Sequence, residues 1–573
     1  MLIPCALTGW LAVTGLSAKR HLTVTRAEVE QLRTAVLAGD HPAMERLLAS
    51  IQTDAVAAHR STDDVLWGAV AHLPVVGPSA TSIRGIAAGV NDLARGPLPA
   101  VVAAGGTLTP AELHPSGGRI DLAAIHDAQA PLARALAGSQ AVARRLDALP
   151  HSTQLGSVDA ARSALARQLT RLTASLGTAD VAARLLPPML GADGPRRYFL
   201  AFQTNAEARG TGGLVGGFGI LQADHGSLKV LALGDNSKLG DRTSPAIDLG
   251  PEFTDRYAQY GSTTHWNNSN MSPHFPSAAA IWLAMWQERT GQRLDGAIAT
   301  DPVALSHMLG ATGPVRLPDG EGVTAGNVVR LTESTAYARF ATDNEARKAY
   351  LQVVAKAALD RMLTAPAAAS RALVAALGAS AGEGRLLISS VHPAEQALLA
   401  DTLLAGVLPV TSRPYAGVVV NNAGGNKLDY YLGRDVSYNA GSCARSRRTS
   451  QVVVKLTNNA PISGLTSYAG GRLDGEPGQA PGSQRLLVSL YGTHGAELSS
   501  ARVDGRVSGV AVEEERGHPV YTVAVDIPSR STSTVTYRLD EPSASGTAIV
   551  PVQPLVRPMT VHQSVMSCAG GPQ

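Results

Sequence analysis

The stretch NAEARGTGGLVGGFGI, Asn205 to Ile220, decides how the middle of this chain folds. It follows the apolar run YFLAFQ, typical of a strand, and has six glycines in the ten positions 210–219. A phosphate-binding loop would lead into a helix, whose N-terminus holds the phosphate. This stretch leads instead into a second strand-like run, GFGILQAD. We therefore expect Gly212, Gly213, Gly216 and Gly217 to allow a bulge or a close backbone contact in a sheet.

The surrounding sequence alternates strands with helices. SLKVLAL and LDGAIAT are typical of strands, whereas SAAAIWLAMWQERTG and ARKAYLQVVAKAALDRML have helical spacing. Thr342 and Glu345 before the last of these form a candidate capping box. The alternation predicts an α/β domain, a mixed sheet with helices packed on it, over residues 190–410.

The two flanks differ from this centre. Residues 19–189 are rich in Ala, Leu and Arg with amphipathic helical spacing, which predicts an α-helical stalk or bundle. Residues 411–573 contain short strand-like runs between Gly, Pro, Asn and Ser clusters, which predicts a β-sandwich. A chain of 573 residues is long enough for several such domains.

The N-terminal residues 1–18, MLIPCALTGWLAVTGLSA, carry no charge before Lys19 and Arg20. Their length suits a membrane anchor, giving a cell-membrane protein with its bulk extracytoplasmic. A signal peptide and a buried helix are the alternatives, and the two basic residues favour the opposite orientation. Cys443 and Cys568 are either a disulfide pair or two buried thiols.

Composition excludes several functions. A net charge of +3 and an aromatic content of 4% argue against nucleic-acid binding. The chain has no HExxH or GxxxxGK[ST] motif, and none of its histidines has metal-ligand spacing.

A candidate anion site comes from separate basic residues. Glu207 and Arg209 end the first strand, and Arg339 and Arg347 flank the start of a helix. Guanidinium groups and free helix N–H groups suit phosphate. Asp343, between the arginines, could orient one of them, bind a divalent cation or simply cap the helix with a pairing to Arg347.

Three more residues are candidates for polar ligand contacts. Asn268 and Asn270 precede a helix, where they either build a turn or present amides to a sugar. Asp301 ends a strand, where α/β sheets bind ligands, although Asp-Pro is also a common helix opening.

The segments RRYFLAFQTNAEARGTGGLVGGFGILQADHGSLKV, NNSNMSPHFP, LDGAIATDPVALSHMLGATGPV and Tyr337–Phe340 resemble the envelope proteins of the domain of unknown function 4012 family. The order of segments is more distantly similar to the LytR-CpsA-Psr phosphotransferases, which move glycans from polyprenyl-pyrophosphate carriers to the cell wall. In that resemblance Asn205 and Arg209, then Arg339, Asp343 and Arg347, match the residues that contact pyrophosphate and hold Mg²⁺. Asn205 stands where that family has an acid, and LGDNSKL lacks its Pro-Arg-Asp.

The resemblance implies an envelope protein that binds a polyprenyl-phosphate-linked glycan or cell-wall polymer, and in its catalytic version transfers it. There the three arginines would neutralise the pyrophosphate, and Asp343 would position Mg²⁺ or activate the attacking hydroxyl. The alternative is a non-catalytic scaffold or adhesion protein with a degenerate α/β domain.

Overall fold

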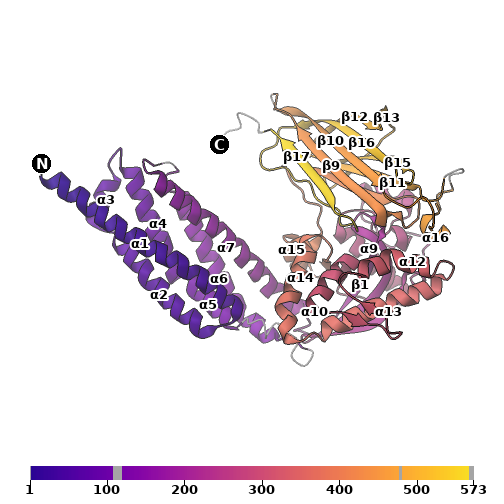
Figure 1. Cartoon of the computed structure of the whole chain (residues 1–573), viewed down its shortest axis with the longest axis horizontal. Coiled ribbons are helices and arrows are strands. Elements are labelled where there is room, and N and C mark those ends of the chain that lie inside the picture. Colours follow the sequence, from indigo (N-terminus) through magenta and orange to yellow (C-terminus); the bar gives the residue numbers. More distant parts are fainter. Residues whose placement is uncertain (1, 108–118, 152, 445, 476–479, 567–573) are drawn as a thin grey trace. The chain divides into compact units, whose positions relative to one another are not determined.

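The computed structural model describes residues 2–107, 119–151, 153–444, 446–475 and 480–566 (Figure 1). The chain divides into two compact units. The first is Met1–Pro195 with Ala223–Ser227, and the second is Arg196–Gln222 with Leu228–Gln573. The second unit contains both the central α/β region and the C-terminal sandwich.

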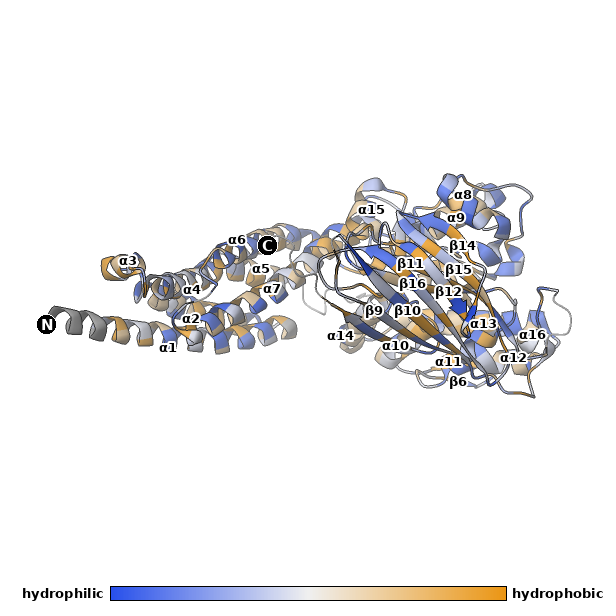
Figure 2. Cartoon of the chain, turned by 90° about the horizontal axis from the view of Figure 1, so that it is seen from above, coloured by the Kyte–Doolittle hydropathy of each residue, from blue (hydrophilic) through white to orange (hydrophobic). Residues whose placement is uncertain are grey.

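The first unit is helical. Its helices over the described residues are α1 (Leu2–Ala38), α2 (His41–Arg60), α3 (Val65–Ala71), α4 (Gly77–Arg95), α5 (Pro97–Thr107), α6 (Leu122–Asp147) and α7 (Gly156–Met189). They carry apolar stripes that meet in small cores, one of which joins Leu32, Met44 and Ile51. Figure 2 shows hydrophobic and hydrophilic residues mixed along each helix, as amphipathic packing requires.

The predicted membrane anchor is wrong. In the part of the chain that the structure describes, no helix is long and apolar enough to cross a membrane. The uncharged run ends at residue 18, but the helix that contains it, α1, continues through Lys19 and Arg20 to Ala38. Within that helix Ala18 and Leu32 are buried against other parts of the unit.

The central sheet of the second unit has the strand order β3-β2-β1-β4-β7. Its strands are β1 (Arg196–Arg209), β2 (Gly212–Asp224), β3 (Ser227–Asp235), β4 (Gly296–Thr300) and β7 (Leu387–Ser390). β4 runs parallel to β1, with Phe202 opposite Thr300, and antiparallel to β7. Two-residue turns join β1, β2 and β3, so β3 runs in the same direction as β1 and β4.

Helices cover both faces of this sheet (Figure 1). On one face α9 (Phe275–Thr290) buries Trp282 and Trp286 against Phe199, in a core completed by α8 (Pro251–Tyr257). On the other face lie α10 (Pro302–Thr312), α13 (Asn344–Leu363) and α14 (Ser370–Gly382). The remaining helices here are α11 (Val328–Arg330), the π-helical turn η4 (Leu331–Thr335), α12 (Ala336–Arg339) and α15 (Pro393–Ala400), with the short strands β5 (Val315–Arg316) and β6 (Gly322–Val323).

The C-terminal region is a two-sheet sandwich. One sheet has the order β13-β12-β16-β10-β9-β17 and the other β14-β15-β11-β8, and alternate residues of both form one core. The strands are β8 (Ala416–Asn422), β9 (Leu432–Ala440), β10 (Arg447–Asn458), β11 (Gln484–Gly492), β12 (Glu497–Val503), β13 (Arg506–Val507), β14 (Ala511–Glu515), β15 (His518–Ile527), β16 (Thr532–Pro542) and β17 (Met559–Val565), with helix α16 (Ser467–Gly470) between β10 and β11.

The glycine-rich stretch is the hairpin of β1 and β2. A Cβ at Gly213 would lie 2.2 Å from the carbonyl oxygen of Thr204, and one at Gly210 would lie 2.2 Å from that of Met271. These distances are far below any real Cβ contact, so Gly213 is at a close backbone contact, as predicted, and Gly210 is at another. At Gly216, also predicted, a Cβ would have its nearest neighbour at 3.4 Å, an ordinary contact.

Two local predictions have an outcome here. The N-cap of α13 is Asp343, which accepts the N–H of Ala346 at 2.8 Å, in place of the predicted Thr342. Cys443 forms a disulfide bond. Its predicted partner Cys568 lies outside the described residues.

We expect Gly213→Ala to destabilise the second unit by about 1–3 kcal/mol, because the added methyl forces the two strands of the hairpin apart. Gly378→Ala, on α14, meets nothing within 4 Å and should be neutral or stabilise by up to about 1 kcal/mol. Calorimetric unfolding of both variants tests this, and equal midpoints would contradict the role of close approach.

Candidate functional site

Glu207, Arg209 and Asn268 come together in a buried cluster. The Glu207 carboxylate lies 3.0 Å from the Arg209 guanidinium and also binds the Lys427 ammonium. Arg209 further donates to the Asn267 carbonyl at 2.7 Å and to Asn268 Oδ1 at 3.1 Å. Burial alone would raise the pKa of Glu207, but Lys427 and Arg209 outweigh it and hold that pKa below its ordinary value. All the hydrogen-bonding atoms of the Arg209 side chain therefore serve protein groups.

The other two predicted arginines have different partners. Arg339 forms two hydrogen bonds to Glu321, at 2.8 and 2.7 Å, and lies over the Tyr350 ring. Arg347 is buried, binds Asn344 Oδ1 and lies 3.8 Å from the centroid of the Tyr468 ring. The structure thus gives each guanidinium its own protein partners and brings no two of them to one carboxylate.

The remaining predicted residues are also held by the fold. Asn205 donates to the Pro554 carbonyl at 3.1 Å, and Asn270 donates to Gln203, Thr211 and Gly213. Asp301 caps α10 through the N–H of Ala304 and pairs with Arg385 at 2.7 Å. Of these three residues, Asp301 alone lines a cavity.

Asp343 does not fit the predicted Mg²⁺ role. One of its carboxylate oxygens accepts the helix N–H of Ala346. Among the described residues no three His, Cys, Asp or Glu side chains converge as ligands for a metal. Because Mg²⁺ needs several oxygen ligands in octahedral geometry, one capping carboxylate gives it no site.

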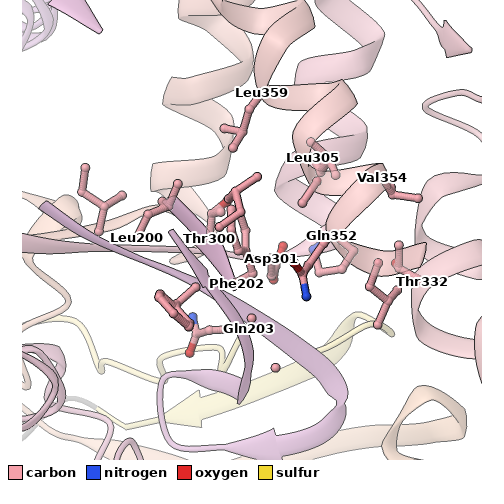
Figure 3. A pocket seen from close by; sticks show the side chains of 18 of the residues that line it. Leu200, Phe202, Gln203, Thr300, Asp301, Leu305, Thr332, Gln352, Val354 and Leu359 are labelled. Atoms are coloured by element: carbon pink, nitrogen blue, oxygen red, sulfur yellow. The ribbon is translucent and has the colours of Figure 1, made fainter. Parts of the chain in front are cut away.

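One cavity of the second unit lies between the sheet and the helices α10, α13 and α14 (Figure 3). It has a volume of about 230 Å³. Figure 3 shows Leu200 and Phe202 of β1 on the sheet side and Leu305 and Leu359 on the helix side. Most of its lining is aliphatic or aromatic, so it suits an apolar ligand.

The polar groups of this cavity gather at one end. Asp235 and Asp301 lie at the carboxyl ends of β3 and β4, and Thr204 lies on β1 just beyond Phe202, which is opposite the end of β4. The carboxyl edge is where α/β sheets bind ligands. Asp235 accepts hydrogen bonds at 3.1 Å from Lys348 and from Gln352 near the start of α13. Every lining residue of α13 after Gln352 is apolar.

Glu333 is the most unusual residue at this polar end. It is 1% exposed, on the π-helical turn η4, and its Oε2 accepts the Thr204 hydroxyl at 2.8 Å and the Ala206 N–H at 2.6 Å. It forms no salt bridge with any described residue. Burial raises its pKa to about 7 against these two hydrogen bonds, and the Asp301 charge adds to the rise. A perturbed carboxyl in a cavity, on a π-helical turn, is typical of a functional site.

The sequence reasoning missed Glu333 and the cavity. Nothing in VVRLTESTAYAR distinguishes this glutamate from a surface residue of a helix.

These features define a protein with a mixed α/β unit, joined to a β-sandwich, that has an amphipathic cavity at the carboxyl edge of its sheet. Residues 193–337 match the profile of a family described as "Protein of unknown function (DUF4012)". The match supports the assignment of this segment to that family. No curated protein and no solved structure matches the chain.

We expect Arg209→Met to destabilise the second unit by about 3–5 kcal/mol, because it leaves a buried charge cluster incomplete. Arg339→Met is the matched control: its exposed ion pair should cost about 1 kcal/mol or less. Denaturant unfolding of the full chain measures both. Similar losses for the two variants would contradict the structural role of Arg209.

We expect Glu333→Gln to change how stability depends on pH. The folded pKa of Glu333, about 7, exceeds its ordinary value of 4.5. The carboxyl therefore lowers the free energy of unfolding of the wild type as pH rises from about 4.5 to 7, by about 3 kcal/mol in total. The variant should lack this loss, so its stability relative to the wild type should increase between pH 5 and pH 8. A constant difference across that range would contradict the raised pKa.

Proposed function

We propose that this protein binds a polyprenyl-phosphate-linked glycan, with the isoprenoid chain in the apolar part of the cavity and the phosphate at its polar end. The single observation behind this proposal is the cavity itself, which is apolar over most of its length and polar at the carboxyl edge of the sheet. A ligand that suits it has a hydrocarbon portion joined to one polar head.

The dimensions support a chain-like ligand. The lining residues of α13 run from Lys348 to Leu363, which is about 22 Å along a helix axis. A long and narrow apolar space favours an extended hydrocarbon over a compact ring system. The glycan, which is polar, would lie outside the cavity beyond the phosphate.

The ligand class comes from the distant resemblance to the LytR-CpsA-Psr phosphotransferases, and with it the proposal of an extracytoplasmic place in the cell envelope. The disulfide bond of Cys443 supports this location, because disulfides form and persist in oxidising compartments. The β-sandwich is consistent with a part that contacts wall polymers or partner proteins.

The contacts of the arginines favour binding without transfer. A pyrophosphate transferase needs preorganised cations free to meet the developing charge. Arg209 and Arg347 are instead buried on protein partners, and Arg339 is paired with Glu321. A carrier or scaffold that holds the lipid-linked glycan is therefore our preferred version of the function.

We expect the full chain to bind a polyprenyl phosphate of defined length and Ala355→Trp to weaken that binding at least tenfold, about 1.4 kcal/mol. The indole would fill the cavity that Ala355 lines. Val353→Trp, on the exposed face of the same helix, should change the affinity less than about twofold. Isothermal titration or native mass spectrometry gives the Kd values. No binding by the wild type, or equal losses in both variants, would reject the proposal.

A further inference from the structure

The polar end of the cavity has an uneven balance of charge. It holds the carboxyl groups of Asp235, Asp301 and Glu333. Lys348 neutralises the first at 3.1 Å and Arg385 the second at 2.7 Å. Glu333 pairs with no cation among the residues that the structure describes. When it is ionised, this end of the cavity carries one uncompensated negative charge, which repels an anionic head group.

The environment of Glu333 does not require an ionisable group. Its Oε2 accepts the Thr204 hydroxyl and the Ala206 N–H, and the carbonyl oxygen of a glutamine could accept both. A buried carboxyl without a cation costs stability compared with such a neutral isostere. These contacts alone therefore do not explain why the residue is a glutamate and not a glutamine.

A second buried carboxyl, that of Asp429, has different surroundings. Asp429 is also fully buried, and it forms no salt bridge with a described residue, but both of its oxygens are occupied. Oδ2 accepts from Ala208 and Asn422, and Oδ1 accepts from Gln484. Asp429 does not line the cavity, whereas Glu333 does. The hydrogen bonds that Glu333 accepts from Thr204 and Ala206 both go to Oε2, so its Oε1 is the oxygen on which we place a proton.

We propose that Glu333 binds the ligand as a neutral carboxylic acid and donates a hydrogen bond from Oε1 to a phosphate oxygen of the lipid head group. This inference rests on the proposed function and names the residue that recognises the phosphate. In the acid form the polar end has equal numbers of positive and negative charges and one free donor. When Glu333 is ionised, the charges at the polar end are unequal and the free donor is lost. Binding of the anion therefore requires protonated Glu333.

The position of Glu333 in the fold supports this role. The turn η4 brings it to the carboxyl edge of β1, where the apolar lining of Phe202 gives way to Thr204. Its pKa near 7 allows the acid form at neutral pH. The titratable or charged groups that surround it are Asp301 of α10 with Arg385, Asp235 of β3 with Lys348 of α13, Tyr337 of α12, Tyr430 and Arg330. Burial raises the pKa of Tyr337, so this phenol stays neutral over the range tested.

The test is the pH dependence of ligand binding by the full chain. The probe is a polyprenyl methyl phosphate diester, since a phosphate monoester itself titrates near pH 6. We expect the wild-type Kd to rise about tenfold from pH 6 to pH 8, because the binding-competent acid form is depleted. Glu333→Gln, which keeps a neutral N–H donor, should bind with a Kd that does not change with pH.

Two controls separate this inference from the proposed function. The uncharged polyprenol should bind wild type and Glu333→Gln equally at every pH, which also shows that the variant is folded. Glu321→Gln, at a half-buried glutamate that pairs with Arg339 and does not line the cavity, should keep the wild-type pH profile with the diester. If wild type and Glu333→Gln show the same profile with the diester, the role of Glu333 is wrong while the binding function stands. If neither the diester nor the polyprenol binds the wild type, both proposals fail.

Discussion

The second unit depends on one buried carboxylate that holds two cations. Glu207 binds Arg209 of its own strand and Lys427 of the segment between β8 and β9, so it ties the central sheet to the sandwich. Such a cluster is stable only when complete, because each charge loses its hydration on burial. Arg209 extends the link to the Asn422 carbonyl of β8, and its own carbonyl accepts from Gln553. The carboxyl end of β1 is thereby fixed in place.

Strand β1 in turn fixes the polar end of the cavity. Its residues alternate between the two faces of the sheet, so Phe199 packs with the aromatic core on α9 while Leu200 and Phe202 line the cavity. The backbone N–H of Ala206 donates to Glu333, one residue before the carboxylate that joins the two halves of the unit. A single strand therefore couples the packing core, the apolar cavity and the candidate recognition group.

Local patterns in the sequence predict the elements well and their partners poorly. The apolar run at 198–203 lies within β1, the run at 294–300 contains β4, and the helical spacing at 346–363 lies within α13. The anchor prediction failed because an uncharged run was read as a membrane segment, although α1 continues through charged residues and packs within the helical unit. Arg209, Arg339 and Arg347 were chosen by residue type, whereas their partners Glu207, Glu321 and Tyr468 are set by tertiary contacts. Glu333 depends on a π-helical turn, for which this sequence gave no recognisable signal.

Glu207 and Glu333 are two buried glutamates tied to neighbouring positions of one strand, and their environments push their pKa values in opposite directions. The chain places its cations around Glu207, where they stabilise the junction, and leaves none for Glu333. When Glu333 is in its acid form, the positive and negative charges at the polar end of the cavity are therefore equal in number. An anionic head group there has to be met by neutral donors, and a carboxylic acid is the strongest neutral donor among the side chains that line this polar end. The residues that first suggested a phosphate site thus hold the fold, and the acid they leave unpaired is the group that we propose for the phosphate.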